Sequence, residues 1–437
     1  LLQLKDQAEI IISISAADIE KNKIRGDHGI TYDVDVLRLI QEFRGYGLFV
    51  GSVCITQYSG QKSADTFKVK LESLGIKVYR LYLIDGYPGN VNMIVSEEGY
   101  GKNDYIITSR PLVIVTAPGP GSGKMATCLS QLYHENKRGI KSGYAKFETF
   151  PIWNLPLKHP VNLAYEAATA DLNDVNMIDP FHLESYGITT VNYNRDIEIF
   201  PVLTAIFEGI FGECPYKSPT DMGVNMAGNC IINNDICMEA SKQEIIRRYY
   251  SSLCRFVKGE CKAEEVYKLE LIMQQAKTSI NDRKVVSAAL LKAETTGQPA
   301  TAIELESGEI VTGKTSELLG AGAALLLNAL KVLSNVDDAV NLISPTVIAP
   351  VQELKTKYLG GTNPRLHTDE VLIALSMSAA TDENARKALN ALPKLKGLQM
   401  HSSVILSEID MKTLHRLGIE ITTEARYENK KVYYSYL

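Results

Sequence analysis

The stretch that most constrains the fold is Leu112-Val-Ile-Val-Thr-Ala-Pro-Gly-Pro-Gly-Ser-Gly-Lys124. Its apolar, β-branched start predicts a buried strand, and residues 125–136 beyond it have the pattern of a helix. A glycine-rich turn between a strand and a helix places backbone N–H groups, a helix N-terminus and one lysine around a single point. The stretch therefore predicts an anion or nucleotide site in an α/β protein.

Strand-like and helix-like segments alternate over the first 150 residues. Strands are predicted over residues 10–14, 47–56, 76–84 and 112–116, and helices over residues 34–43 and 64–74. Such alternation implies parallel strands joined by right-handed crossovers, with helices on both faces of the sheet. We predict a mostly parallel, doubly wound N-terminal sheet whose ligand binds at the carboxyl ends of the strands, where the glycine-rich turn lies.

The remaining segments suggest a multidomain α/β protein. Residues 142–225 are rich in Pro, Asn, Asp and aromatic residues with little periodicity, which predicts irregular covering loops. Residues 239–294 read as charged helices, and residues 301–312 alternate about Ser307-Gly308 as a β-hairpin does. An apolar helix is predicted over residues 316–334. We expect an α/β domain over residues 1–225, a helical segment over 226–300 and a C-terminal α/β subdomain over 301–437.

The composition of the chain limits the kinds of molecule that it is expected to bind. A net charge of −5 over 437 residues argues against a nucleic-acid or membrane partner. Seven cysteines without C-x-x-C spacing suggest free buried thiols in a reducing compartment, and the most apolar run, residues 318–333, is too short to span a bilayer. We predict a cytoplasmic protein with a small-molecule ligand, and a homo-oligomer stays open. Because the chain begins at Leu1 rather than Met, further native residues are expected upstream.

The glycine-rich turn matches the P-loop pattern G-x-x-x-x-G-K-[ST] only in part. Aligned on Gly123-Lys124, the pattern puts Pro118 at the first glycine and Met125 at the Ser/Thr position. The missing hydroxyl normally binds the Mg²⁺ that bridges the β- and γ-phosphates, so a standard P-loop NTPase is disfavoured and the role of Mg²⁺ is uncertain. We predict that a nucleotide such as ATP, or a phosphorylated metabolite, is held by the turn residues Gly119, Gly121, Ser122, Gly123 and Lys124. The alternative is a tight turn that uses glycine for steric reasons, with Lys124 as a solvated charge.

Four residues are candidates for acid–base chemistry beside the phosphate. Asp179 follows an apolar run and lies close to His182, which suggests a catalytic pair, although Pro180 makes an ordinary turn aspartate equally compatible. Lys146 and Glu148 are two residues apart on a predicted strand, so they project to the same face and each can tune the pKa of the other. A surface ion pair is the alternative for these two.

Two arginines are further candidates for binding an anion. The planar fork of Arg195 suits a phosphate or carboxylate, and its alternative role is an ion pair with Asp196 at a helix start. Arg365 and His367 precede a predicted helix, either as its N-terminal approach or as part of a polar site.

Several motifs resemble an uncharacterised bacterial family, a domain of unknown function. They are Thr116-Ala-Pro-Gly-Pro-Gly-Ser-Gly-Lys124, Gly143-Tyr-Ala-Lys-Phe-Glu-Thr-Phe-Pro151, Asn176-Met-Ile-Asp-Pro-Phe-His182, and the stretches at residues 161–171 and 192–201. The resemblance runs along the whole chain and implies an α/β N-terminal part, a helical middle and a C-terminal α/β sandwich subdomain. Some relatives are labelled ATP-dependent zinc peptidases, but the resemblance carries over no established catalytic residue.

The sequence contains no zinc motif. H-E-x-x-H is absent, the seven histidines never pair at i and i+4, and no cysteine pair supplies a half-site, so we predict no metal site. Two hypotheses are therefore retained ahead of a metal-dependent peptidase. The protein is an enzyme acting on a phosphorylated small molecule, or a nucleotide-responsive binding protein without turnover, which the missing Mg²⁺ ligand favours.

Overall fold

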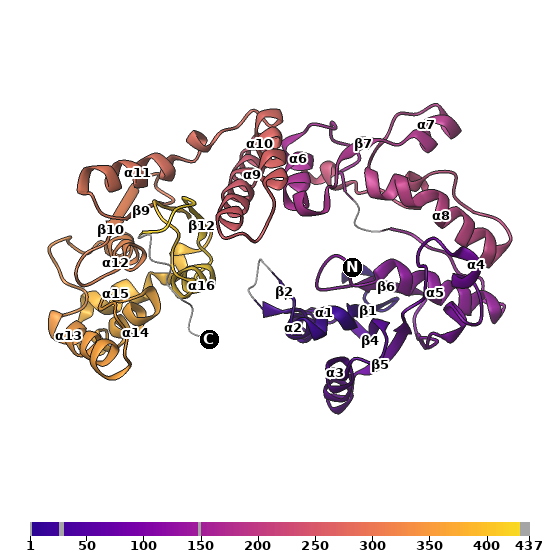
Figure 1. Cartoon of the computed structure of the whole chain (residues 1–437), viewed down its shortest axis with the longest axis horizontal. Coiled ribbons are helices and arrows are strands. Elements are labelled where there is room, and N and C mark those ends of the chain that lie inside the picture. Colours follow the sequence, from indigo (N-terminus) through magenta and orange to yellow (C-terminus); the bar gives the residue numbers. More distant parts are fainter. Residues whose placement is uncertain (1, 26–29, 147–149, 429–437) are drawn as a thin grey trace. The chain divides into compact units, whose positions relative to one another are not determined.

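A computed structural model describes residues 2–25, 30–146 and 150–428 (Figure 1). The chain packs as two compact units. The N-terminal unit comprises residues 1–153 and 176–226, and the C-terminal unit comprises residues 154–175 and 227–437.

The N-terminal unit is built on a four-stranded parallel sheet. Its strands are β1 (Ala8–Ser15), β4 (Phe49–Tyr58), β5 (Lys77–Tyr82) and β6 (Leu112–Thr116), in the order β5-β4-β1-β6. Every residue of β1 is buried, as expected for a strand covered on both faces, which is why it reads as an apolar run in the sequence. The predicted parallel N-terminal sheet is confirmed.

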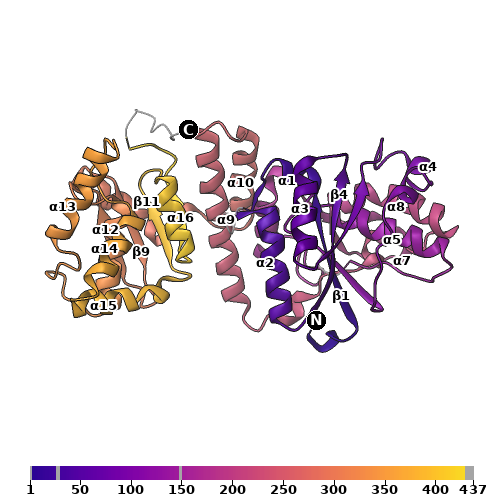
Figure 2. The ribbon, with the colours of Figure 1, turned by 90° about the horizontal axis from the view of Figure 1, so that it is seen from below.

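Helices cover both faces of this sheet, as Figure 2 shows. On one face, alternate β1 side chains such as Ile10 and Ile12 pack against α1 (Ala16–Glu20), α2 (Tyr32–Gly45) and α3 (Lys62–Ser73). On the other face, the Ser13 hydroxyl lies 3.0 Å from the Thr127 hydroxyl of α5 (Lys124–Lys137). Side chains alternate between the two faces of a strand and return to the same face of a helix every 3.6 residues. Apolar residues at these spacings therefore bring the helices onto both faces of the sheet.

The strand order reverses at β1. The chain runs from β1 to β4 and β5 on one side, then returns to place β6 on the other side of β1. The connections that leave the carboxyl ends of β1 and β6 therefore diverge to opposite faces, since α1 and α5 lie on opposite faces. Such a switch point is where open α/β sheets form their ligand crevice.

The rest of the N-terminal unit is more regular than predicted. Its elements are β2 (Ile24–Arg25), β3 (Ile30–Thr31), α4 (Val91–Ile94), β7 (Asn176–Ile178), α7 (Pro180–Tyr186), β8 (Val191–Tyr193) and α8 (Asn194–Phe211). The expectation of irregular loops over residues 142–225 was wrong here, because α8 alone is 18 residues long. Pro201 lies inside α8 and hid the helical spacing of the buried Phe200, Leu203 and Phe207.

The C-terminal unit has a mixed four-stranded sheet. Its strands are β9 (Ala300–Glu304), β10 (Ile310–Lys314), β11 (Gln399–Ser402) and β12 (Glu420–Thr423), in the order β10-β9-β11-β12. β9 is antiparallel to both neighbours, whereas β11 and β12 are parallel. The hairpin predicted about Ser307-Gly308 is confirmed by the β9–β10 pair, with Gly308 at a φ of 81°.

Helices pack on both faces of this second sheet. Ala302 of β9 packs against α11, whereas its neighbour Ile303 faces the core that contains α12 and α14. The helices of the C-terminal unit are α6 (Pro160–Ala168), α9 (Asn234–Val257), α10 (Ala263–Gln275), α11 (Lys284–Thr296), α12 (Ala321–Leu333), α13 (Pro345–Glu353), α14 (Thr368–Ser378), α15 (Glu383–Asn390) and α16 (Glu408–Arg416). Across the described ranges, every helix is too short or too polar to cross a lipid bilayer.

Candidate functional site

The glycine-rich turn joins β6 to α5 at the switch point. Gly121 and Gly123 have left-handed φ angles of 79° and 82°, and Gly123 occupies the N-cap position of the 14-residue α5. As a glycine, this N-cap residue has no side chain that could cap the helix end. Lys124 is the first helical residue and is exposed. The positive end of the helix dipole and the first-turn amides thus occur at an exposed lysine.

Packing contacts hold the turn in place. The Thr56 hydroxyl donates to the carbonyl of Ser122 at 2.9 Å, and the buried Ser122 hydroxyl donates to the carbonyl of Gly119 at 3.0 Å. A Cβ on Gly119 would lie 2.2 Å from the Tyr32 hydroxyl, and one on Gly123 would lie 2.6 Å from the Thr56 hydroxyl. These two glycines are therefore needed because a side chain would not fit, as in the alternative of a tight turn. The glycine content of the turn alone does not indicate a phosphate site.

The carboxyl ends of β1 and β4 extend past the end of β6. Thr116, the last residue of β6, is paired with Ile12, whereas β1 continues to Ser15, which is paired with Thr56. Ser15 donates to the side-chain oxygen of Gln57 at 3.0 Å, and Gln57 is exposed with a left-handed φ of 53°. Polar side chains thus line this end of the sheet beside the turn.

Sequence reasoning missed these polar neighbours of the turn. They are Ser15, Tyr32, Thr56 and Gln57. Ser15, Thr56 and Gln57 stand at or just past the ends of the first two predicted strands. The rule that ligands bind at the carboxyl ends of parallel strands therefore gave a signal for three of them.

Asp179 serves as a structural cap. It is fully buried, and its carboxylate accepts from the backbone N–H groups of Phe181 at 3.0 Å and His182 at 3.1 Å, at the start of α7. It also accepts from the hydroxyl of Thr220 at 2.6 Å and from its N–H at 3.2 Å. These four contacts match the turn-aspartate interpretation, and an acid–base role for Asp179 stays a prediction.

His182 belongs to the same structural cluster. Its Nδ1 lies 2.9 Å from the Ser218 hydroxyl and 3.6 Å from Asp221 Oδ1. In a catalytic triad the acid and the nucleophile bind different ring nitrogens, whereas both of these partners approach Nδ1. The Ser218 hydroxyl also accepts from the Asp221 N–H at 3.2 Å in a capping box. The arrangement holds a short helical turn against α7 rather than activating a serine.

Lys146 does not lie on a strand as predicted, and its side chain is held in an ion pair. It forms an ion pair with Asp196 in the first turn of α8, and the side chains are only 14% and 9% exposed. Asp196 thus pairs with Lys146, where the sequence had suggested Arg195. Arg195 itself is exposed, with its guanidinium 5.6 Å from the centre of the Tyr193 ring. Glu148 lies outside the described residues.

Cysteine chemistry does not contribute to the turn. Burial raises the pKa of Cys128, four residues beyond Lys124 in α5, to about 12, so its thiol stays protonated at neutral pH. All seven cysteines are free, but the expectation that they are buried holds only for Cys54, since Cys230 is exposed and the other five are of intermediate exposure. Across the ranges described here, no group of three or more His, Cys, Asp or Glu residues is placed to hold a metal ion.

Comparison with known proteins identifies the family. The description "Domain of unknown function DUF1846, N-terminal" matches residues 1–277, and the corresponding C-terminal description matches residues 281–433. The chain belongs to the DUF1846 family. This confirms the family resemblance found in the sequence.

Relatives of this DUF1846 chain include the UPF0371 proteins of Streptococcus pyogenes serotype M5 (strain Manfredo), S. pyogenes serotype M18 (strain MGAS8232) and S. thermophilus (strain ATCC BAA-250 / LMG 18311). Each is 57% identical over 433 residues, which is 99% of this chain and 88% of the relative. These names state neither a ligand nor an activity, so the function of the DUF1846 chain has to be argued from its own geometry.

A second polar cluster of the DUF1846 chain lies at the start of α14. His367 Nδ1 lies 3.0 Å from Asp410 Oδ2. The other carboxylate oxygen of Asp410 accepts from the N–H of Thr368 at 2.8 Å and from its hydroxyl at 3.0 Å. Arg365, the other residue of the predicted polar site, pairs with Glu428 at 2.8 Å. The cluster joins the starts of α14 and α16, as a helix N-terminus does when side chains satisfy its donors.

This cluster predicts a pH-dependent stability. The hydrogen bond to Asp410 raises the pKa of His367, so protonated His367 stabilises the folded state below about pH 6.5 and the contribution is lost as the pH rises through the folded pKa. We expect the stability advantage of the wild type over His367→Gln to fall by about 1 kcal/mol between about pH 6 and pH 8. Urea unfolding of both proteins across this range measures the difference.

Other histidines do not obscure this test. Burial lowers the pKa values of His134, His401 and His415, so their contributions change with pH in the opposite direction. Both proteins carry these residues, and their effects cancel in the difference. A stability difference that stays constant across the range would show that His367 is not coupled to Asp410 through its charge.

Proposed function

We propose that the N-terminal unit binds a phosphate-bearing small molecule, a nucleotide or a phosphorylated metabolite, between the carboxyl ends of β1 and β6. The observation that carries this proposal is the start of α5, which has a glycine at its N-cap and lies at the switch point of a parallel sheet. Parallel sheets bind ligands at this position, and helix starts bind phosphate.

Each group of the turn has a role in this proposal. The N–H groups of the first turn of α5 point out of the helix end and donate to phosphate oxygens, which the helix dipole also favours. The exposed Lys124 supplies a positive charge at the same end. The exposed Gln57, which Ser15 holds by a hydrogen bond at the ends of β1 and β4, contacts the hydroxyl or amide groups of the rest of the ligand.

Binding without turnover is the better supported form of the proposal. Of the four predicted acid–base residues, Asp179, His182 and Lys146 are all engaged in buried or half-buried structural contacts. Met125 stands where a P-loop has the hydroxyl that binds Mg²⁺. We therefore propose a binding or regulatory protein that responds to a phosphorylated ligand, rather than an enzyme that consumes it.

Lys124→Ala is the direct test of binding. Removing the charge at the helix start is expected to raise the dissociation constant for ATP, ADP or a sugar phosphate by about tenfold or more. Isothermal titration with each ligand, with and without Mg²⁺, measures this change. Lys137→Ala is the matched control, because it removes an exposed lysine from the opposite end of α5 and is expected to leave binding unchanged.

Two results would contradict the proposal. The first is equal affinity of the wild type and Lys124→Ala for every ligand that binds, and the second is no heat of binding for any of them. A phosphate-release assay separates the two functional forms. Release from ATP that disappears in Lys124→Ala and persists in Lys137→Ala would establish an enzyme in place of a binding protein.

A further inference from the structure

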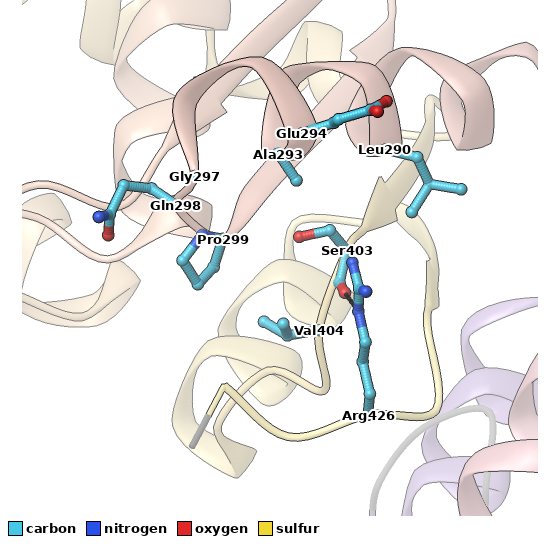
Figure 3. A pocket seen from close by; sticks show the side chains of 9 residues that line it. All are labelled: Leu290, Ala293, Glu294, Gly297, Gln298, Pro299, Ser403, Val404 and Arg426. Carbon is cyan, nitrogen blue, oxygen red and sulfur yellow. Dashed lines mark hydrogen bonds between the residues drawn. The ribbon is translucent and has the colours of Figure 1, made fainter.

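A pocket of about 520 Å³ lies within the C-terminal unit, beside the C-terminal end of α11 (Figure 3). The pocket is an open surface hollow rather than an enclosed cavity, and its volume is in the range of small-molecule sites, roughly 300–1,000 Å³. One wall comes from α11, and the facing wall comes from the chain after β11 and after β12. The pocket belongs to one unit throughout, so its geometry is independent of the proposed phosphate site.

The wall that faces α11 carries a hydrogen-bond donor on the chain after β12. The guanidinium of Arg426 is fixed by a hydrogen bond from Nε to the carbonyl of Ser403 at 2.6 Å (Figure 3). Its two Nη groups donate to no other residue within the described part of the chain. Ser403 is fully buried, and its hydroxyl accepts from the Ala300 N–H at 2.9 Å, so it supports this wall rather than contacting a ligand. A guanidinium that is fixed through its Nε suits a carboxylate.

The wall from α11 is negative. Glu294 lies in the last turn of the helix, where the carbonyl groups and the dipole already present partial negative charge. This turn contains no basic residue, and Glu294 forms no ion pair in the described ranges. A carboxylate is unfavourable at this helix end, and such local conflicts mark functional positions. A cationic group bound beside Glu294 would relieve the conflict.

Between the charged groups the pocket is aliphatic, because Leu290, Ala293, Pro299 and Val404 also line it. A ligand with only a negative charge would be attracted to Arg426 but repelled by the negative end of α11. A ligand with only a positive charge would be attracted to the end of α11 but repelled by Arg426. A ligand with both charges and an apolar body satisfies all three surfaces. We propose that this pocket binds an aliphatic zwitterion, a free α-amino acid or a short peptide, with its carboxylate on Arg426 and its ammonium group beside Glu294.

Isothermal titration of the full chain tests the proposal with L-leucine and L-leucyl-L-leucine, which distinguish a free amino acid from a peptide. Binding of either is expected, and removing one charge from the ligand should weaken it by about tenfold or more. N-acetyl-L-leucine lacks the ammonium group and L-leucinamide lacks the carboxylate. Equal binding of N-acetyl-L-leucine, or binding of neither leucine nor the dipeptide, would overturn the proposal.

Protein variants locate the site. Glu294→Gln should weaken binding of L-leucine, or of the dipeptide if that is the tighter ligand, about tenfold while leaving the affinity for N-acetyl-L-leucine unchanged. Arg426→Gln should weaken binding of the same ligand without changing the affinity for L-leucinamide. Glu306→Gln and Arg386→Gln are exposed charge-matched controls in the same unit and should have no effect. Because Glu294 is exposed, its variant is expected to fold even if Arg426→Gln does not, and unchanged binding by Glu294→Gln would refute the assignment.

Discussion

Arg283→Ala is expected to destabilise the C-terminal unit by about 3–5 kcal/mol, because it removes a charged donor from a set of buried acceptors. Arg283 is fully buried, and it donates to the hydroxyl of Thr422 at 3.0 Å and the side-chain oxygen of Gln243 at 3.3 Å. It also donates to the carbonyls of Met400 at 3.3 Å and Glu420, at 2.6 Å. Burial lowers its pKa to about 10, so the guanidinium remains charged at neutral pH.

Hydrogen exchange followed by mass spectrometry measures this loss where it occurs. Peptides from β11 and β12 are expected to lose protection in Arg283→Ala, and peptides from β6 in the N-terminal unit provide the reference within the same sample. Arg386→Ala is the matched control, because this exposed arginine on α15 is expected to change stability by less than about 0.5 kcal/mol. Unchanged protection of β11 and β12 would mean that the acceptors find other donors and that Arg283 is dispensable.

The contacts of Arg283 also show where the boundary between the two family descriptions falls relative to the compact units. It lies in the segment matched by the C-terminal family description, residues 281–433, whereas its partner Gln243 lies in the segment matched by the N-terminal description, residues 1–277. Both residues belong to the C-terminal unit by packing. The boundary between the family descriptions therefore crosses a buried hydrogen-bond network, and it does not coincide with the boundary between compact units.

Local patterns predicted the sheet of the N-terminal unit well. The strand over residues 112–116 was predicted with its observed bounds, since a β-branched run between turn residues has few alternatives. The helices around it were placed to within about two residues, as caps and glycines usually allow. α8 was missed because Pro201 interrupts a pattern that is otherwise periodic, and its burial against the rest of the unit decides the helix.

The candidate site was predictable in position but not in its contacts. The glycine-rich turn identified the end of β6, yet the contacts that fix it come from Thr56 and Tyr32, which are far away in the sequence. Asp179 and His182 were chosen for their residue types and their place after an apolar run. Their partners, Thr220 and Ser218, lie 41 and 36 residues further along the chain. Pairing over such distances is set by tertiary packing, which a local pattern does not contain.

Asp179→Ala is expected to lower the free energy of unfolding of the N-terminal unit by about 2–4 kcal/mol, because the variant loses a helix cap and leaves buried donors without an acceptor. The donors are the N–H groups of Phe181 and His182, together with the N–H and hydroxyl of Thr220. Trp153, the single tryptophan of the chain, lies in this unit, so urea unfolding followed by its fluorescence measures the loss.

Two further variants decide between a structural and a catalytic Asp179. Glu184→Ala removes an exposed carboxylate from the same helix, α7, and is expected to change stability by less than about 0.5 kcal/mol. Asp179→Asn keeps the shape of the side chain, but its amide group replaces one acceptor by a donor that faces the N–H groups, so we expect it to lose stability as well. A catalytic aspartate predicts the reverse, with an unchanged urea midpoint in Asp179→Asn and the loss of any phosphate release. Because the carboxylate accepts four hydrogen bonds from buried neighbours, we expect the midpoint to move.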